Sequence, residues 1–212
     1  MKINRLALRL CMCALVLLRA LSLYADGKDS LSRKMIHMAG IDVKPAYVFP
    51  THEFFAGSNA TFSPIRKNLS VHLKYGFKFA PDTYFGRMYP HAVQGIGVGY
   101  NTFFHSSELG NPWSVYAFQT SRIASLTPRL SLDYEWNFGA SFGWKKYDAE
   151  SNPYNRVVGS KMNAYIHLSF LLNWQLDAQT NLRAGIGATH FSNGNTGYPN
   201  AGVNAFGASI GL

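Results

Sequence analysis

Apolar and polar residues alternate over three long stretches of the chain. In residues 69–79 the odd positions are apolar or aromatic, and the even positions carry Ser, His, Lys and Gly. In residues 129–144 and 161–174 the even positions are the apolar ones. A period of two places successive side chains on opposite faces of a β-strand. Each stretch therefore predicts a strand with one apolar and one mostly polar face.

These predicted strands are much longer than the usual soluble strand of about five or six residues. Their length suits a tilted membrane crossing, which takes roughly 9 to 11 residues. A closed barrel pairs every backbone amide in lipid and leaves no sheet edge. We therefore expect an all-β protein, an eight-stranded antiparallel transmembrane β-barrel of the outer membrane. Weaker alternation supplies the other five strands, at about residues 40–49, 92–104, 113–122, 180–192 and 202–212.

A secreted β-sandwich is the soluble alternative, with the apolar faces in the core and the polar faces in solvent. Lys74 and Lys78 stand opposite the aromatic face of the first long stretch. Asp133 and Glu135 stand opposite the aromatic face of the second. Charges of opposite sign on these polar faces can neutralise one another inside a narrow lumen. This arrangement favours the barrel over the sandwich.

The lengths of the connections predict the orientation, because short turns of such barrels face the periplasm and long loops face outside. The connection at residues 176–180 is short, whereas those at residues 50–67 and 145–160 are long. With both termini periplasmic, the two long connections are external. One connection does not fit, because the predicted periplasmic turn from Pro81 to Pro90 is also long.

Composition agrees with this class and excludes others. The 212 residues include 20 Lys and Arg against 11 Asp and Glu, and charged and aromatic residues make up 15% each. Disordered and coiled-coil chains need more charge and fewer aromatic rings. The basic balance does not indicate nucleic-acid binding, since the sequence has no recognition element for it.

Residues 1–25 have the features of a secretory signal peptide. Basic residues precede an apolar run at residues 10–18, which is far shorter than the roughly 20 residues of a transmembrane helix. We predict cleavage after residue 25 and an outer-membrane β-barrel domain at residues 26–212. Cys11 and Cys13 both leave with the signal peptide, so the exported domain has no cysteine.

The last predicted hairpin carries polar residues on its apolar face. On the seventh predicted strand this face continues to His190 and Ser192, and on the eighth it includes Asn204. If the turn centres on Gly197, antiparallel pairing places Asn204 directly across from His190. Polar side chains toward lipid are disfavoured unless something offsets them. The three residues are therefore expected together on the outside wall, at the external end.

A serine, a histidine and a third polar group are the minimum for acyl transfer. The imidazole takes the hydroxyl proton, and the third group fixes the tautomer of the imidazole. The alternative is that His190 and Ser192 only mark where the wall meets the lipid headgroups. The His-x-Ser spacing alone favours this alternative.

The longer segment around these residues is more specific. His-Phe-Ser-Asn at residues 190–193, followed by Pro199-Asn200-x-Gly202, resembles the active-site segment of the PagL-like lipid A 3-O-deacylases. This family consists of eight-stranded outer-membrane barrels. The likeness is densest in residues 182–212, and residues 108–112 also resemble more distant branches. The resemblance implies an enzyme that removes the ester-linked acyl chain at position 3 of lipid A.

The resemblance also implies a role for each residue of the motif. His190 corresponds to the general base and Ser192 to the nucleophile. Asn200 corresponds to the asparagine that holds the oxyanion, helped by a backbone N–H of Asn193 or Gly194.

Two positions depart from the family pattern. The family has a glutamate where this chain has Asn204, the expected partner of the imidazole. An amide oxygen can accept the imidazole N–H, but it brings no negative charge to stabilise the imidazolium. The chain also ends in Leu212, where outer-membrane barrels often end in an aromatic residue.

We therefore expect a serine esterase at the external leaflet of the outer membrane of a Gram-negative cell, with lipid A or lipopolysaccharide as substrate. No cofactor and no metal are expected. A non-catalytic barrel, structural or adhesive, is the second hypothesis, and a homodimer is left open. Basic residues near the outer rim are candidates for binding the lipid A phosphates, with ordinary loop charge as the alternative: Lys145, Lys146, Arg156 and Lys161.

Overall fold

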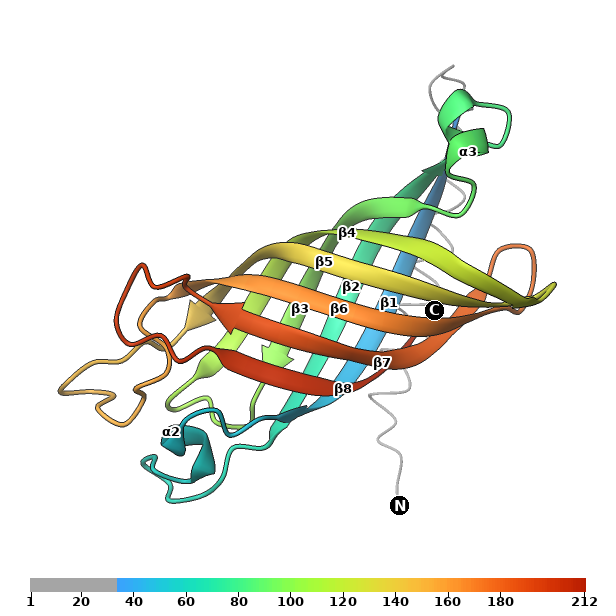
Figure 1. Cartoon of the computed structure of the whole chain (residues 1–212). Coiled ribbons are helices and arrows are strands. Elements are labelled where there is room, and N and C mark those ends of the chain that lie inside the picture. Colours follow the sequence, from blue (N-terminus) through green and yellow to red (C-terminus); the bar gives the residue numbers. More distant parts are fainter. Residues whose placement is uncertain (1–33) are drawn as a thin grey trace, which may run out of the picture.

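The computed structural model describes residues 34–212, so the predicted signal peptide lies outside the described residues. Eight strands in this part form a closed barrel, in which each strand is antiparallel to the next and β8 pairs with β1 (Figure 1). The predicted eight-stranded antiparallel barrel is thereby confirmed. The strands are β1 (Met35–Val48), β2 (Lys67–Phe79), β3 (Val93–Thr102), β4 (Gly110–Thr127), β5 (Leu130–Trp144), β6 (Met162–Gln175), β7 (Asn181–Ser192) and β8 (Val203–Gly211).

Two strands are longer than the sequence pattern predicts. β4 extends beyond residues 113–122 at both ends, and its pairing with β5 shifts register at three points. Each shift breaks the period of two on which the prediction depended. β1 begins five residues before the predicted start near residue 40. The alternation fails there because the polar His37 shares a face with Val43 and Tyr47.

Two short helices lie in the connections, α2 (Glu53–Ala56) between β1 and β2 and α3 (Tyr84–Met88) between β2 and β3. Within residues 34–212 no helix is long and apolar enough to cross a membrane. The loops at residues 49–66, 103–109, 145–161 and 193–202 gather at one end of the barrel, and α3 lies at the other end (Figure 1). The long connection that did not fit the predicted orientation is therefore a folded segment.

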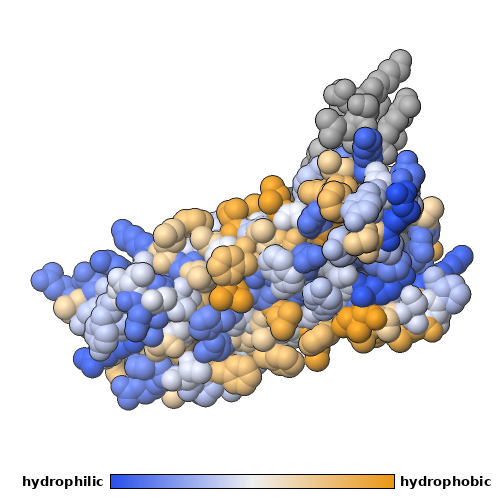
Figure 2. Space-filling model, turned by 45° about the horizontal axis from the view of Figure 1, so that its top comes forward, coloured by the Kyte–Doolittle hydropathy of each residue, from blue (hydrophilic) through white to orange (hydrophobic). Residues whose placement is uncertain are grey.

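The two faces of each strand differ in character, as the alternation predicts. On β6, Ile166, Leu168 and Phe170 face outward and are 42%, 50% and 50% exposed, whereas His167 and Ser169 between them are buried. Apolar residues lie along the side of the barrel, and hydrophilic residues gather toward both ends (Figure 2). A β-sandwich would bury its apolar faces. The exposed apolar wall therefore excludes the sandwich.

The polar faces meet in the lumen, where charges pair. Lys74 forms ion pairs with Asp42 and Glu135. Arg183 binds the same two carboxylates, at 2.7 Å from Asp42 and 3.4 Å from Glu135. All four side chains lie inside the wall, and each charge has a direct partner of opposite sign. Buried charges require such pairing.

Aromatic rings fill the lumen toward the end with the long loops. The ring centroid of Phe191 lies 5.0 Å from that of Trp144 and 5.4 Å from that of Tyr165. The ring centroids of Trp144 and Phe103 are 5.5 Å apart. Phe191 is only 2% exposed. Since neighbouring residues of a strand point to opposite faces, burying Phe191 in this cluster turns the residues on either side of it outward.

Candidate active site

The structure places the predicted site residues together on the outside of the barrel. His190 and Ser192 lie on β7, on the face that also carries Ile186, which is 53% exposed. Asn204 lies on β8 directly opposite His190, in the register predicted from a turn centred on Gly197. All of them lie at the end of the barrel that carries the long loops.

His190 is hydrogen-bonded to Asn204. The imidazole Nδ1 lies 2.7 Å from the amide Oδ1 of Asn204. An amide oxygen can only accept, so this bond requires the hydrogen on Nδ1 and leaves Nε2 with a free lone pair. Asn204 is itself fixed, because its backbone carbonyl accepts a hydrogen bond from the N–H of Phe49 at 2.9 Å. His190 is therefore oriented in the tautomer that a general base requires.

Ser192 makes its contacts with Asn200 rather than with His190. The amide nitrogen Nδ2 of Asn200 donates to the Ser192 hydroxyl at 3.0 Å, and the hydroxyl lies 3.3 Å from Oδ1 of the same side chain. No hydrogen bond joins Ser192 to His190 in residues 34–212. Catalytic hydrogen bonds of enzymes without substrate are often long and tighten only when substrate binds.

The backbone at the end of β7 also points toward this pair. The N–H of Gly194 donates to the Ser192 hydroxyl at 3.1 Å, and the N–H of Asn193 donates to Oδ1 of Asn200 at 3.2 Å. The Asn193 side chain supports the turn, because its Nδ2 donates to the carbonyl of Gly197 at 2.8 Å. Two backbone donors and one side-chain amide thus surround the Ser192 hydroxyl and its neighbour Asn200.

Gly202 lets the chain pass close to the imidazole. Its φ of +71° lies in the left-handed region, which glycine adopts without the penalty that other residues incur. A Cβ at this position would lie 3.1 Å from Cε1 of His190. A larger residue would therefore strain the backbone and crowd the imidazole at once.

The long loop at residues 145–161 holds Asn200 in place. Val158 pairs with Asn200 in an antiparallel bridge, and the N–H of Ala201 donates to the carbonyl of Val157 at 3.1 Å. Gly159 lies against the same segment, since a Cβ there would come within 2.4 Å of the carbonyl oxygen of Pro199. The segment that carries Asn200 is therefore clamped by a loop distant in sequence.

Asn155 organises this loop, and the sequence analysis missed it. The side-chain oxygen of this fully buried residue accepts the N–H groups of Val157 at 3.3 Å and Val158 at 3.2 Å. Its amide nitrogen donates to the carbonyls of Glu108 at 2.8 Å and Lys145 at 2.9 Å. The loop is rich in Asn, Pro and Tyr, but no spacing singled out Asn155. Its hydrogen bond to Glu108 ties this loop to the stretch 108–112.

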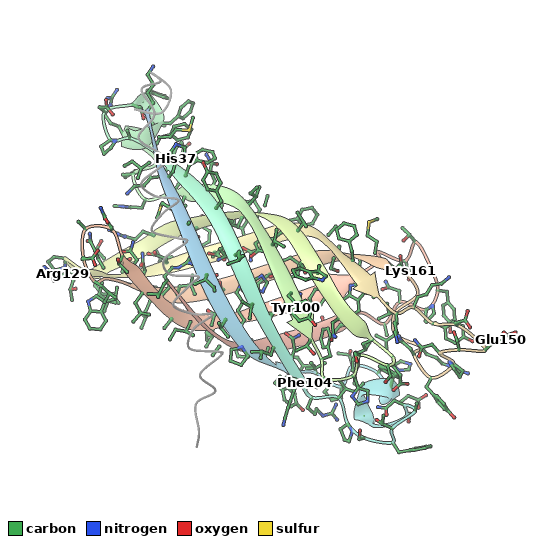
Figure 3. The ribbon with its side chains drawn as sticks, turned by 180° about the vertical axis from the view of Figure 1, so that it is seen from behind. His37, Tyr100, Phe104, Arg129, Glu150 and Lys161 are labelled. Atoms are coloured by element: carbon green, nitrogen blue, oxygen red, sulfur yellow. The ribbon has the colours of Figure 1, made fainter. Side chains whose placement is uncertain are left out.

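The four basic residues of the outer rim, Lys145, Lys146, Arg156 and Lys161, are exposed at this end of the barrel. Lys161 directly precedes β6, and Figure 3 shows it at the end opposite His37 and Arg129. The Nζ of Lys145 donates to the carbonyl of Ser107 at 3.1 Å. The rim thus carries positive charge at the level of the site.

The fold and the site define a small β-barrel with an apolar outer wall and a Ser, His and Asn cluster at one end of that wall. Comparison with protein families matches residues 94–212 to the lipid A 3-O-deacylase (PagL) family. The match covers more than half of the chain and includes the whole terminal hairpin. The chain therefore belongs to this family.

A solved structure agrees with the assignment at the level of the fold. The crystal structure of the outer membrane enzyme PagL superimposes with a TM-score of 0.56 and 11% sequence identity, and the match covers 82% of this chain and 98% of that chain. A comparison with curated proteins finds no match. The protein is an eight-stranded barrel of the outer membrane, as the sequence analysis predicts.

Proposed function

We propose that this protein is a lipid A 3-O-deacylase that hydrolyses the ester-linked acyl chain at position 3 of lipid A by a serine and histidine mechanism. One observation carries the proposal. On the apolar outer wall, at the end with the long loops, an oriented His190–Asn204 pair lies beside a Ser192–Asn200 pair. A polar cluster in this position is costly in lipid unless it meets a substrate that lies in the same leaflet.

The substrate approaches from the side of the barrel. Lipid A lies in the outer leaflet with its acyl chains along the wall and its phosphorylated sugars at headgroup level. The ester carbonyl at the base of an acyl chain then reaches the level of Ser192. The exposed basic residues of the external loops, such as Arg156 and Lys161, are proposed to bind the phosphates.

In the first step the Ser192 hydroxyl attacks the ester carbonyl while Nε2 of His190 takes the hydroxyl proton. Asn204 holds the imidazole in the required tautomer and accepts from Nδ1–H throughout. The tetrahedral intermediate collapses, His190 returns the proton to the leaving sugar oxygen, and Ser192 keeps the acyl group. A water molecule activated by His190 then hydrolyses the acyl ester and restores the serine.

The negative charge on the carbonyl oxygen needs donors that are already in place. Nδ2 of Asn200 lies 3.0 Å from the Ser192 hydroxyl, and the backbone nitrogen of Gly194 lies 3.1 Å from it. The N–H of Asn193 is close to both, because it donates to Oδ1 of Asn200. We assign these three groups to the oxyanion. The mechanism uses only side chains, backbone amides and water, so it needs no cofactor.

The test compares the wild type with Ser192→Ala in a host whose lipid A is intact, with mass spectrometry of the extracted lipid A. The wild type should remove one hydroxyacyl group, and Ser192→Ala should leave lipid A unchanged. Ser151→Ala is the matched control, because Ser151 is exposed on a long loop and, among residues 34–212, its hydroxyl binds only Asp148. Intact lipid A with the folded wild type would instead support a non-catalytic barrel, structural or adhesive.

We also propose that the chain is exported before it acts. Residues 1–25 act as the signal peptide, and the exported barrel begins at residue 26. The exported barrel works in the outer membrane of a Gram-negative cell with its site in the external leaflet. A homodimer is compatible with the mechanism but is not needed by it, because one chain supplies every proposed catalytic group.

A further inference from the structure

The connection at residues 80–92 is a folded segment at the end of the barrel opposite the proposed active site. It contains α3, which projects beyond the barrel where β2 ends (Figure 1). The Thr83 hydroxyl caps this helix by accepting the N–H of Gly86 at 3.0 Å and donating to the carbonyl of Ala80 at 2.7 Å. A Cβ on Gly86 would meet the carbonyl oxygen of Ala80 at 1.9 Å, so only glycine permits this tight turn.

This ordered segment exposes large apolar side chains. Tyr84, Phe85, Met88 and Tyr89 are 63%, 52%, 54% and 57% exposed. Tyr84, Phe85 and Met88 lie on α3 and Tyr89 caps its C-terminus, and spacings of one, four and five residues from Tyr84 place all four on one side of the helix as an apolar patch. A patch that is both ordered and exposed marks a surface that meets another apolar phase.

The patch continues the lipid-facing wall. Phe79 lies at the end of β2 in the outward series that includes Leu73 and Tyr75, and its ring packs 5.3 Å from that of Phe85. From Leu69 to Phe79 this series spans about 33 Å along the strand at about 3.3 Å per residue, or about 25 Å across the membrane at a tilt of about 40°. That height equals the apolar band of outer-membrane barrels, about 25 Å. Phe79 therefore marks the inner edge of the band, and α3 lies just beyond it.

A basic residue lies beside the patch. Arg87 is on α3, where its Nη1 donates to the carbonyl of Asp82 at 2.7 Å. Aromatic rings with flanking cations are typical of segments at the boundary between lipid and water.

We propose that residues 80–92 form an interfacial anchor that inserts Tyr84, Phe85, Met88 and Tyr89 into the inner leaflet of the outer membrane. The partner is a phospholipid surface, with acyl chains against the rings and phosphate groups near Arg87. Lipid is the expected partner because the patch continues the lipid-facing wall through the Phe79–Phe85 contact. Such an anchor fixes the height and tilt of the barrel in the membrane, independently of any catalytic activity.

The test places a nitroxide spin label on α3. The only cysteines of the sequence are Cys11 and Cys13, so their replacement by Ser gives a background free of cysteine. Met88→Cys is labelled in this background, in the full chain reconstituted into vesicles of phosphatidylethanolamine and phosphatidylglycerol. Gln179→Cys is the matched control, because Gln179 is exposed in the β6–β7 connection at the same end of the barrel. Ile186→Cys, on the outward face of β7, reports the apolar band.

The measurement is the collision rate of each label with oxygen, which concentrates in lipid, and with a water-soluble nickel chelate. At Met88→Cys we expect high oxygen accessibility and a nickel accessibility several-fold lower than at Gln179→Cys. Nickel accessibility equal to that of Gln179→Cys would overturn the proposal, since the helix would then lie in water. Low accessibility to both reagents would also overturn it, since the helix would then be covered by protein or by a second copy of the chain.

Discussion

The partner of His190 offers a direct test of the proposed mechanism. This partner is Asn204, an amide at the position where the family has a carboxylate. Its Oδ1 accepts a hydrogen bond from Nδ1 of His190 at 2.7 Å. Asn204→Asp keeps the side-chain length and changes the charge alone. When His190 takes the Ser192 proton it becomes an imidazolium, and a carboxylate stabilises that cation more than an amide does. The variant should therefore raise the rate of the chemical step.

The size of the effect follows from the kind of hydrogen bond that changes. A neutral hydrogen bond contributes about 1 kcal/mol, and one to a charged group about 1.5–3 kcal/mol. The difference of about 0.5–2 kcal/mol corresponds to a rise in kcat of about 2- to 30-fold. The new charge costs little stability, about 0–1 kcal/mol, because the site lies near the interface rather than at the bilayer midplane.

The assay is the release of hydroxyacyl chains from lipid A in mixed micelles, under conditions where chemistry limits the rate. Asn204→Ala, which removes the acceptor, should lower kcat and serves as the opposite control. Asn204→Glu restores the residue of the family and should also accelerate the reaction. If Asn204→Asp folds, as judged by its heat-dependent mobility in gel electrophoresis, and its kcat is unchanged or lower, the role assigned to Asn204 is wrong.

Two further predictions concern stability and loop support. Lys74→Met should lower the free energy of unfolding by about 3–5 kcal/mol, because it removes the ion pairs of Lys74 with two buried carboxylates, which then share the single positive charge of their other ion-pair partner, Arg183. Lys74→Met with Glu135→Gln should recover part of this loss in urea titrations followed by tryptophan fluorescence, and a double variant less stable than the single one would contradict the pairing. Asn155→Ala should lower kcat by up to about 100-fold through displacement of Asn200, whereas the change at Ser151 should have no effect. Equal kcat values for both variants would refute the positioning role.

Much of the fold could be predicted because the alternation has a direct physical cause. One face of each strand meets lipid and the other meets the lumen, so β2, β5 and β6 are recognisable from their period alone. Where a strand bulges, as β4 does, the period breaks and the prediction ends too early. The helix α3 had no signal of its own, because its five residues are fixed by a cap at Thr83 and a close contact at Gly86 rather than by a long pattern.

The proposed site likewise has a part that could be predicted from the sequence and a part that could not. Parity and register placed His190 opposite Asn204, because the strands β7 and β8 obey the period up to their last residues. The contact between Ser192 and Asn200 depends on the path of the turn between the strands, which no period describes. Asn155 was out of reach for a further reason. Its role arises from contacts with residue 145 at the start of its own loop and with residue 108 on another loop, which the pairing of β4 with β5 brings alongside.

The lumen explains how a polar cluster can stand on a lipid-facing wall. Facing outward costs His190 and Ser192 favourable hydration, and a slip of one residue would hide both in the lumen. That slip would also move Phe191 out of its contacts with Trp144 and Tyr165 and into lipid. Fully burying a side chain of this size contributes about 1.5–3 kcal/mol, and the slip would break the register of every neighbouring pair on β7 as well. The aromatic packing inside the barrel therefore holds the proposed catalytic residues outside it.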